Sequence, residues 1–322
     1  MAVRDAFQAL RKVSAGRFDA SRHVATLAVV LLLSPIPSFC ASRCNYTWSL
    51  LVFCLPTAAI SYWFLRTPER DLHPIRSAFW VTLILLFSTG LVLNLLFADN
   101  FFEYPATEAV IGWTVPSLDF FSVDREHPIP VEEFGFYLFG FLMMLLVYIW
   151  GDLYFFSEYR RKPPVAEAIV GFSWKPFTAG VLLLGGIWAH CVLRPTGHSP
   201  GYLTYLVLIP ILVTTLLWRT AEPGINWRAY NFMFVLVLAL SVVLEVTLGL
   251  PQGWWAYQQR WMVGISVSSW SDLPIEAVLV WFVAAIATVV TFESAKRFLH
   301  MEKPLPERFL GRPLRRDRRS RT

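Results

Sequence analysis

The sequence predicts an all-α polytopic membrane protein, with about eight transmembrane helices arranged as two parallel four-helix repeats. Three observations support this fold class. The chain of 322 residues is 56% hydrophobic and only 16% charged, with a mean hydropathy of +0.50, which is far more apolar than a soluble domain of this size. Apolar stretches of helical length recur along the chain. The basic residues collect in alternate loops between these stretches.

Eight stretches of mainly apolar residues each approach the roughly 20 residues that a helix needs to cross hydrocarbon. The first and fifth are the shortest. Residues 24–42 also fit a secretory signal, because an apolar core is followed there by proline and small residues, and this alternative leaves the later spans unchanged. The eight stretches lie near residues 24–40, 48–65, 78–98, 130–151, 177–193, 202–219, 229–249 and 272–292.

The Lys and Arg residues follow this topology. Of the 28 basic residues, all but Arg43, Arg125, Arg194 and Arg260 belong to the tails and loops of one side. Cytoplasmic loops carry the excess of Lys and Arg, so we expect a multi-pass protein of the plasma membrane with both termini in the cytoplasm. The net charge of +5 is therefore a topological signal, and no nucleic-acid partner is expected.

An internal repeat divides the chain into two units. Residues 64–67 (FLRT) match 217–220 (LWRT), and residues 102–104 (FEY) match 255–257 (WAY), both at an offset of 153. Four spans per unit is an even number, so both copies face the same way. The basic tails are expected to attract anionic lipid. The predicted domains are an N-terminal cytoplasmic tail (1–23), repeat 1 (24–156), a cytoplasmic linker (157–176), repeat 2 (177–296) and a basic cytoplasmic tail (297–322).

Carboxylates at the start of two spans are candidate catalytic groups. Glu132 and Glu133 follow Pro130 where the fourth span begins, and Glu276 follows Pro274 in the same way at the last span. Proline and an acid at a helix start also have a purely structural interpretation, because both suit the first turn. The two prolines are included among the candidate substrate-binding positions.

Glu245 and Asn94 lie near the same boundary of the hydrocarbon, close to the outward ends of spans seven and three. An ionisable residue inside a span is by default a functional candidate, so Glu245 joins the predicted catalytic acids. Some aromatic residues at this level are expected to form the usual interfacial belt. Together with Asn94, the candidate contacts to substrate are Tyr104, Phe134, Trp254, Trp255 and Tyr257.

Carboxyls and aromatic faces in a mostly dry site suit acid–base chemistry on a cation. Desolvation favours a neutral acid, so one glutamate can stay protonated beside an ionised neighbour. Aromatic faces stabilise positive charge. These properties suit the protonation of an alkene, and they also suit proton-coupled transport. The Cys and His residues show no metal-ligand spacing, so neither a metal nor a cofactor is expected.

The twofold pattern resembles the membrane-integral carotenoid (lycopene) cyclase family in its fused two-domain form. The pattern is an aromatic residue two before a tyrosine, then a glycine, then Pro-x-Glu opening a span. The first copy has residues 102–104, Gly112 and 130–134, and the second has 255–257, Gly264 and 274–276.

The resemblance implies a redox-neutral isomerase of carotenoid biosynthesis, in which an acid protonates the end of lycopene or a related linear carotenoid, a ring closes, and a base removes a proton. Glu132 and Glu133 match the family's acidic pair and Glu276 matches the first acid of the second pair, whereas Ala277 replaces its second acid. The implied partners are the carotenoid in the bilayer and other carotenoid-biosynthesis enzymes. Two alternatives stay open: a non-catalytic carotenoid-binding or scaffold protein of the same fold, and a proton-coupled transporter.

Overall fold

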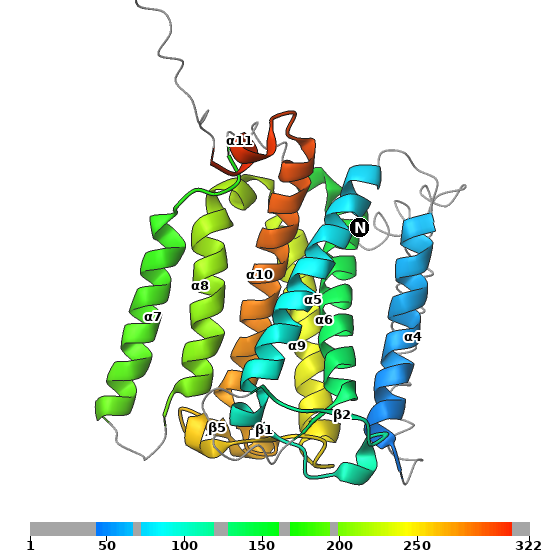
Figure 1. The fold of residues 1–322 in the computed structure, drawn as a ribbon, viewed down its shortest axis with the longest axis vertical. Coiled ribbons are helices and arrows are strands. Elements are labelled where there is room, and N and C mark those ends of the chain that lie inside the picture. Colours follow the sequence, from blue (N-terminus) through cyan, green and yellow to red (C-terminus); the bar gives the residue numbers. More distant parts are fainter. Residues whose placement is uncertain (1–42, 67–71, 119–127, 161–167, 194–198, 311–322) are drawn as a thin grey trace, which may run out of the picture.

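The protein is a bundle of long helices whose axes follow one common direction (Figure 1). The computed structural model describes residues 43–66, 72–118, 128–160, 168–193 and 199–310. Two helices, α6 and α9, continue into π-helical turns at Gly151–Phe155 and Glu245–Gly249. The helices are α4 (Asn45–Arg66), α5 (His73–Phe101), α6 (Val131–Trp150), α7 (Trp174–Leu193), α8 (Gly201–Ala221), α9 (Trp227–Leu244), α10 (Ile275–His300) and α11 (Leu305–Leu310).

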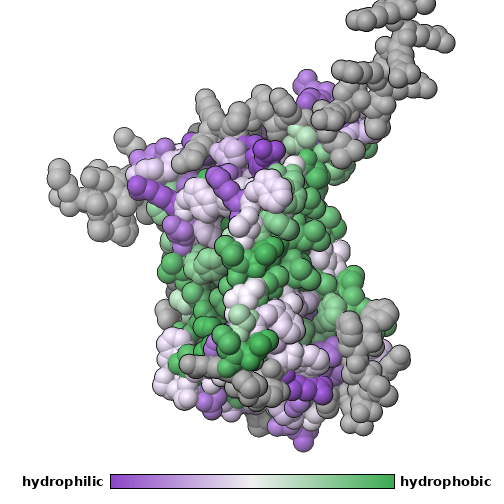
Figure 2. Space-filling view, turned by 90° about the vertical axis from the view of Figure 1, so that its left-hand side faces the viewer, coloured by the Kyte–Doolittle hydropathy of each residue, from purple (hydrophilic) through white to green (hydrophobic). Residues whose placement is uncertain are grey.

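Six of the described helices, α5 to α10, are long and apolar enough to cross a membrane. Helix α4, with 22 residues, coincides with the second expected span. Figure 2 shows a hydrophobic belt between two more hydrophilic ends. The all-α polytopic membrane fold predicted from the sequence is confirmed. The span expected near 24–40 and the tail 1–23 lie outside the described residues.

Helices α6 and α10 form the centre of the bundle. Helix α6 packs against α4, α5, α9 and α10, while α10 packs against α8, α9, α5 and α6. The two sets of neighbours are equivalent. If α4, α5 and α6 are replaced by α8, α9 and α10, and the reverse, the neighbours of α6 become the neighbours of α10. The repeat detected in the sequence therefore has a counterpart in the packing, with α7 as a further helix beside α8.

The central position of α6 explains its burial. Residues 142–150 are buried without interruption, because neighbouring helices surround this part of α6, and a helix that is apolar all round belongs in such a place. The first turn of the same helix carries Glu132 and Glu133, which are also buried. The packing of α6 therefore places two ionisable groups inside the bundle.

Three short antiparallel ribbons cover one end of the bundle. Because they pair backbone groups beyond the helix ends, they satisfy hydrogen bonds that apolar surroundings cannot. The pairs are β1 (Phe102–Glu103) with β4 (Ala256–Tyr257), β2 (Thr114–Val115) with β3 (Ile129–Pro130), and β5 (Ser266–Val267) with β6 (Leu273–Pro274).

The β1–β4 ribbon joins the two units in a symmetric register. Phe102 lies opposite Tyr257, and Glu103 lies opposite Ala256. In the internal repeat, residues 102–104 match residues 255–257, so Glu103 and Ala256 are equivalent positions. Because these two residues lie opposite each other, a local twofold axis passes between them. The β2–β3 and β5–β6 ribbons are then the equivalent hairpins of the two units.

Equivalent backbone features start α6 and α10. Pro130 has φ −66° and Pro274 has φ −71°, and each ends a strand and forms the N-cap of the next helix. Each unit also has a glycine in the loop before this strand. Gly112 and Gly264 have φ of +85° and +83°, a region of backbone conformation that favours glycine. The span expected from residue 272 therefore begins later, at Ile275, because the residues before it pair with β5.

Close packing of α7 on α8 depends on Gly180, where a Cβ atom would overlap the side chain of Ile211. We expect Gly180→Ala to cost about 1–3 kcal/mol, the usual penalty for overpacking. The measurement is the thermal unfolding temperature in detergent. Gly185→Ala on the same helix is the matched control, because no described atom lies within 4 Å of a Cβ there. Equal unfolding temperatures for the two variants would contradict this packing.

Candidate functional site

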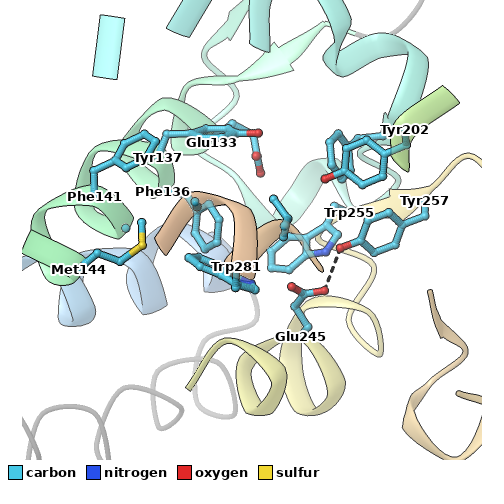
Figure 3. Close-up of a pocket in the computed structure, with 14 residues that line it drawn as sticks. Glu133, Phe136, Tyr137, Phe141, Met144, Tyr202, Glu245, Trp255, Tyr257 and Trp281 are labelled. Atoms are coloured by element: carbon cyan, nitrogen blue, oxygen red, sulfur yellow. Dashed lines mark hydrogen bonds between the residues drawn. The ribbon is translucent and has the colours of Figure 1, made fainter. Parts of the chain in front are cut away.

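A cavity between the central helices is the candidate site, and we call it the acid cavity (Figure 3). The space it spans, open solvent included, is about 690 Å³. Its walls come from both units. The lining residues labelled in Figure 3 are Glu133, Phe136, Tyr137, Phe141, Met144, Tyr202, Glu245, Trp255, Tyr257 and Trp281.

The acid cavity lies on the boundary between the two repeats. Several of its lining residues form pairs at matching positions of α6 and α10, separated by the same 144 residues that separate Glu132 from Glu276. A ligand in the cavity would therefore touch both repeats, as is common where parallel repeats meet in membrane proteins. The pairs are Phe136 with Val280, Tyr137 with Trp281, and Gly140 with Ala284.

Glu133 enters the acid cavity from the first turn of α6. The residue is 8% exposed, and its Oε1 accepts a hydrogen bond of 3.0 Å from the hydroxyl of Tyr46 on α4. A buried carboxyl needs such a donor, because an unpaired buried polar group costs about 1–3 kcal/mol. Glu245 is close enough to Glu133 for the two carboxyls to interact electrostatically.

Glu245 opens the π-helical turn that ends α9, a local irregularity that is frequent at functional sites. It is 5% exposed. Its Oε2 accepts a hydrogen bond of 2.8 Å from the Tyr257 hydroxyl, drawn as a dashed line in Figure 3. Burial, and after it the neighbouring Glu245 carboxyl, raise the pKa of Tyr257 well above its ordinary value. The hydroxyl therefore keeps its proton and remains a donor to Glu245.

The other two predicted catalytic acids hold loops of the strand-covered end. The backbone N–H of Ile111 donates to Oε1 of Glu132 at 2.9 Å, and the backbone N–H of Val263 donates to Oε1 of Glu276 at 2.7 Å. Residues 111 and 263 match in the repeat, so this is the same bond in both units. Neither Glu132 nor Glu276 lines the acid cavity, and we assign both to the support of these loops.

Of the three aromatic residues predicted around position 255, two line the acid cavity: Trp255 and Tyr257. Trp254 is 1% exposed and stacks on Tyr46 with ring centroids 5.0 Å apart. Its Nε1 donates a hydrogen bond of 2.9 Å to Oδ1 of Asn45. Trp254 therefore anchors the start of α4, which supplies the tyrosine that donates to Glu133.

The remaining predicted contact residues do not line the acid cavity. Pro130 and Pro274 are helix N-caps, Asn94 is buried in α5, and Phe134 is half-buried in α6. Burial raises the pKa of Tyr104 well above its ordinary value. Tyr104 is also close enough to Glu133 for the two side chains to interact electrostatically. The Tyr104 hydroxyl is buried and has no hydrogen-bond partner among the described residues.

Two tyrosines of the site, Tyr46 and Tyr202, are not among the residues predicted from the sequence. Each is the second residue of its helix, α4 or α8. The ring of Tyr46 lies 5.6 Å from that of Trp255, and the ring of Tyr202 lies 5.4 Å from that of Phe102. The two tyrosines occupy the same position in matching helices, which marks them as a related pair. This relation is visible only when the two repeats are aligned by the starts of their helices.

Buried charges at the opposite end of the bundle are paired. Glu293 accepts a hydrogen bond of 2.9 Å from Tyr148 and forms an ion pair of 2.6 Å with Lys296. Asp152 accepts a hydrogen bond of 3.1 Å from Asn226. These bonds join α6, α9 and α10, so they support packing.

Within the described residues, no group of three or more His, Cys, Asp and Glu side chains could hold a metal ion.

No family model, curated protein or solved structure matches this chain.

The acid cavity itself offers two carboxyls, each held by one tyrosine, beside aromatic faces. Phe136 lies in the middle of these faces, with ring centroids 6.1 Å from Trp255 and 5.8 Å from Trp281. Such a site can give a proton to an apolar ligand, stabilise positive charge on it and take a proton back.

Removal of the Glu276 carboxyl should destabilise the fold. Glu276→Ala leaves the N–H of the buried Val263 without its acceptor, so we expect a loss of about 1–3 kcal/mol, measured by thermal unfolding in detergent. Glu276→Gln keeps an acceptor oxygen and should retain most of the stability. Glu108→Ala removes an exposed charge at the same end of the bundle and serves as the control. If Glu276→Ala and Glu108→Ala were equally stable, the bond would not hold the loop.

Proposed function

We propose that the protein is a carotenoid end-group cyclase that isomerises lycopene or a related linear carotenoid. One observation carries the proposal: two buried glutamates from different repeats, Glu133 and Glu245, line one aromatic cavity between membrane helices. The resemblance of the sequence pattern to membrane-integral carotenoid cyclases supports the same reaction. An ionisable pair inside a membrane protein is costly, which also supports a chemical role.

In the proposed reaction, one of the two carboxyls gives its proton to a C=C bond at the end of the chain. A neighbouring C=C bond attacks the resulting carbocation, a C–C bond forms and a six-membered ring closes. The other carboxyl, in its ionised form, removes a proton from a carbon next to the cation, and a C=C bond is restored. One proton is gained and one is lost, so the product is an isomer and the reaction consumes no oxidant, reductant or cofactor.

Aromatic rings would stabilise the carbocation between these two proton transfers. Phe136, Trp255 and Trp281 surround the space beside the acids. A cation over an aromatic face gains about 2 kcal/mol or more when water is excluded. The tyrosines keep each carboxyl in place, since a proton transfer depends on the position of the donor and acceptor atoms.

The deep part of the acid cavity supports an apolar substrate over a transported ion. Beyond the acids, the lining residues include Phe141, Met144 and Ala284, which offer no site for a proton. The buried acids at the other end, Asp152 and Glu293, do not line the cavity and are paired. A non-catalytic carotenoid-binding protein would need the cavity but would not need both acids.

Replacement of either acid by its amide should abolish cyclisation, because an amide can neither give nor take the proton. We expect Glu133→Gln and Glu245→Gln each to lower conversion by about 100-fold or more, the usual contribution of a general acid or base. The measurement is expression in a host that accumulates lycopene, followed by chromatography of the extracted pigments.

Glu132→Gln is the matched control, because it changes the adjacent residue, keeps an acceptor for the Ile111 N–H and lies outside the acid cavity. We expect it to retain most of the conversion. Cyclisation that persists in folded Glu133→Gln and Glu245→Gln would refute the assignment of the acids. If the wild-type protein retained lycopene but did not convert it, the carotenoid-binding alternative would be favoured.

We also propose that the protein lies in the plasma membrane with both termini in the cytoplasm. This orientation follows from the excess of Lys and Arg in the tails and alternate loops. The acid cavity then lies toward the outer side, because its acids come from the ribbon-covered end of the bundle. The basic tails face anionic lipid, and other carotenoid-biosynthesis enzymes would exchange substrate with the protein through the bilayer.

Cysteine labelling tests the orientation. In a variant whose own cysteines are replaced, Glu108→Cys at the ribbon-covered end should react with a membrane-impermeant maleimide on intact cells. Glu158→Cys at the opposite end should react only after the cells are permeabilised. Both positions are exposed, so accessibility within the protein does not separate them. The reverse labelling pattern would place the termini outside.

A further inference from the structure

A second cavity lies beside the acid cavity, and we call it the tail cavity. It lies between α4, α6 and α9. Three residues, Phe136, Gly140 and Trp281, line both cavities. The rings of Phe136 and Trp281 meet edge to face with centroids 5.8 Å apart. The two spaces therefore share one wall, which we call the aromatic wall.

The aromatic wall is thin at Gly140. A Cβ atom at this position would meet only ring atoms of Trp281, at an ordinary contact distance of 3.8 Å. The wall here therefore consists of two side-chain rings, with no third side chain beside them on α6. Rotation of these two rings away from each other would join the two cavities.

The tail cavity is lined by hydrocarbon. Two of its polar side chains have partners inside the protein: Tyr46 donates to Glu133, and Thr247 donates to its own helix backbone at 2.6 Å. Because these hydrogen bonds are already made, a ligand gains most from apolar contact. The apolar lining includes Leu50, Met143, Leu240, Val243, Leu244 and Leu248.

The tail cavity reaches the lipid-facing surface between α4 and α9. Val243, which is 57% exposed, and Thr247, which is also exposed, both line it. In the described part of the chain, α4 packs on α6 and makes at most marginal contact with α9. Within the described residues, the mouth of the tail cavity is therefore open to the bilayer between α4 and α9.

The matching region of the second repeat is filled. Between α8 and α5, the rings of Phe97, Phe101, Tyr202 and Tyr205 pack together, with centroid distances from 4.8 to 6.5 Å. The two repeats therefore differ here: the side of α4 keeps open space next to the acids, while aromatic side chains occupy the side of α8.

We propose that the tail cavity binds the long polyene chain of the substrate, which passes the aromatic wall so that its end group lies between Glu133 and Glu245 and its far end extends to the mouth between α4 and α9. This inference rests on the proposed function. From Glu133 to Met144 the acid cavity follows eleven residues of α6, a rise of roughly 16 Å, and an extended linear carotenoid is longer than this. Only one end of the carotenoid reaches the acids at a time. The tail cavity favours substrates with a long polyene chain over shorter ones.

The test obstructs the mouth of the tail cavity without touching the acids. Val243→Trp places a large ring at the mouth, and Val235→Trp places the same ring on the exposed face of α9, away from both cavities. Thr247→Trp is a second variant at the mouth. The substrates are lycopene and an acyclic 20-carbon polyene with the same end group, and kcat/KM is measured for each.

We expect Val243→Trp and Thr247→Trp to lower kcat/KM for lycopene by about tenfold or more and to change that for the 20-carbon polyene by less than about threefold. Val235→Trp should behave as the wild-type protein. If the wild-type protein cyclises lycopene and the mouth variants match Val235→Trp, or lose both substrates equally, the tail cavity is overturned and the proposed function stands. If the wild-type protein converts neither substrate, the proposed function and this inference fail together.

Discussion

Buried carboxyls in a membrane protein need hydrogen-bond donors, and this constraint organises the ribbon-covered end of the bundle. Glu132 and Glu276 each accept from a backbone N–H group of a loop, and Glu132 also accepts from the Thr47 hydroxyl. Glu133 and Glu245 accept from tyrosine hydroxyls. The backbone bonds hold the loops against the helix starts. The tyrosine bonds hold Glu133 and Glu245 at positions where both carboxyls line the acid cavity.

Pseudo-symmetry explains why the cavity lies where it does, and departures from symmetry explain why the two repeats place their acids differently. The β1–β4 ribbon and the α6–α10 contact both lie where the two repeats meet, so matching residues of the repeats line opposite walls of one space. At the position of Glu133, the second repeat has Ala277, which is 1% exposed. A second carboxyl there would add another buried charge; instead, the partner acid comes from α9.

The spans and their start signals could be predicted because they depend on local sequence. The seventh span, expected at 229–249, is a helix at Trp227–Gly249. Pro-x-Glu is a local signal for a helix start, and both α6 and α10 begin there, whereas the strand that ends at each proline has no such signal. Two-residue strands carry no periodicity of their own, and β6 forms only because β5 lies beside it.

Hydrophobic length and self-similarity are properties of the chain, so a multi-pass helical membrane protein with an internal repeat can be recognised without the tertiary structure. Which acids line the same cavity depends instead on tertiary packing. Glu132 and Glu133 are adjacent and share every local signal, yet they point about 100° apart around α6. One meets the loop at Ile111, and the other meets the cavity shared with Glu245. That separation depends on how α6 packs against α4 and α9, a long-range contact that no local pattern specifies.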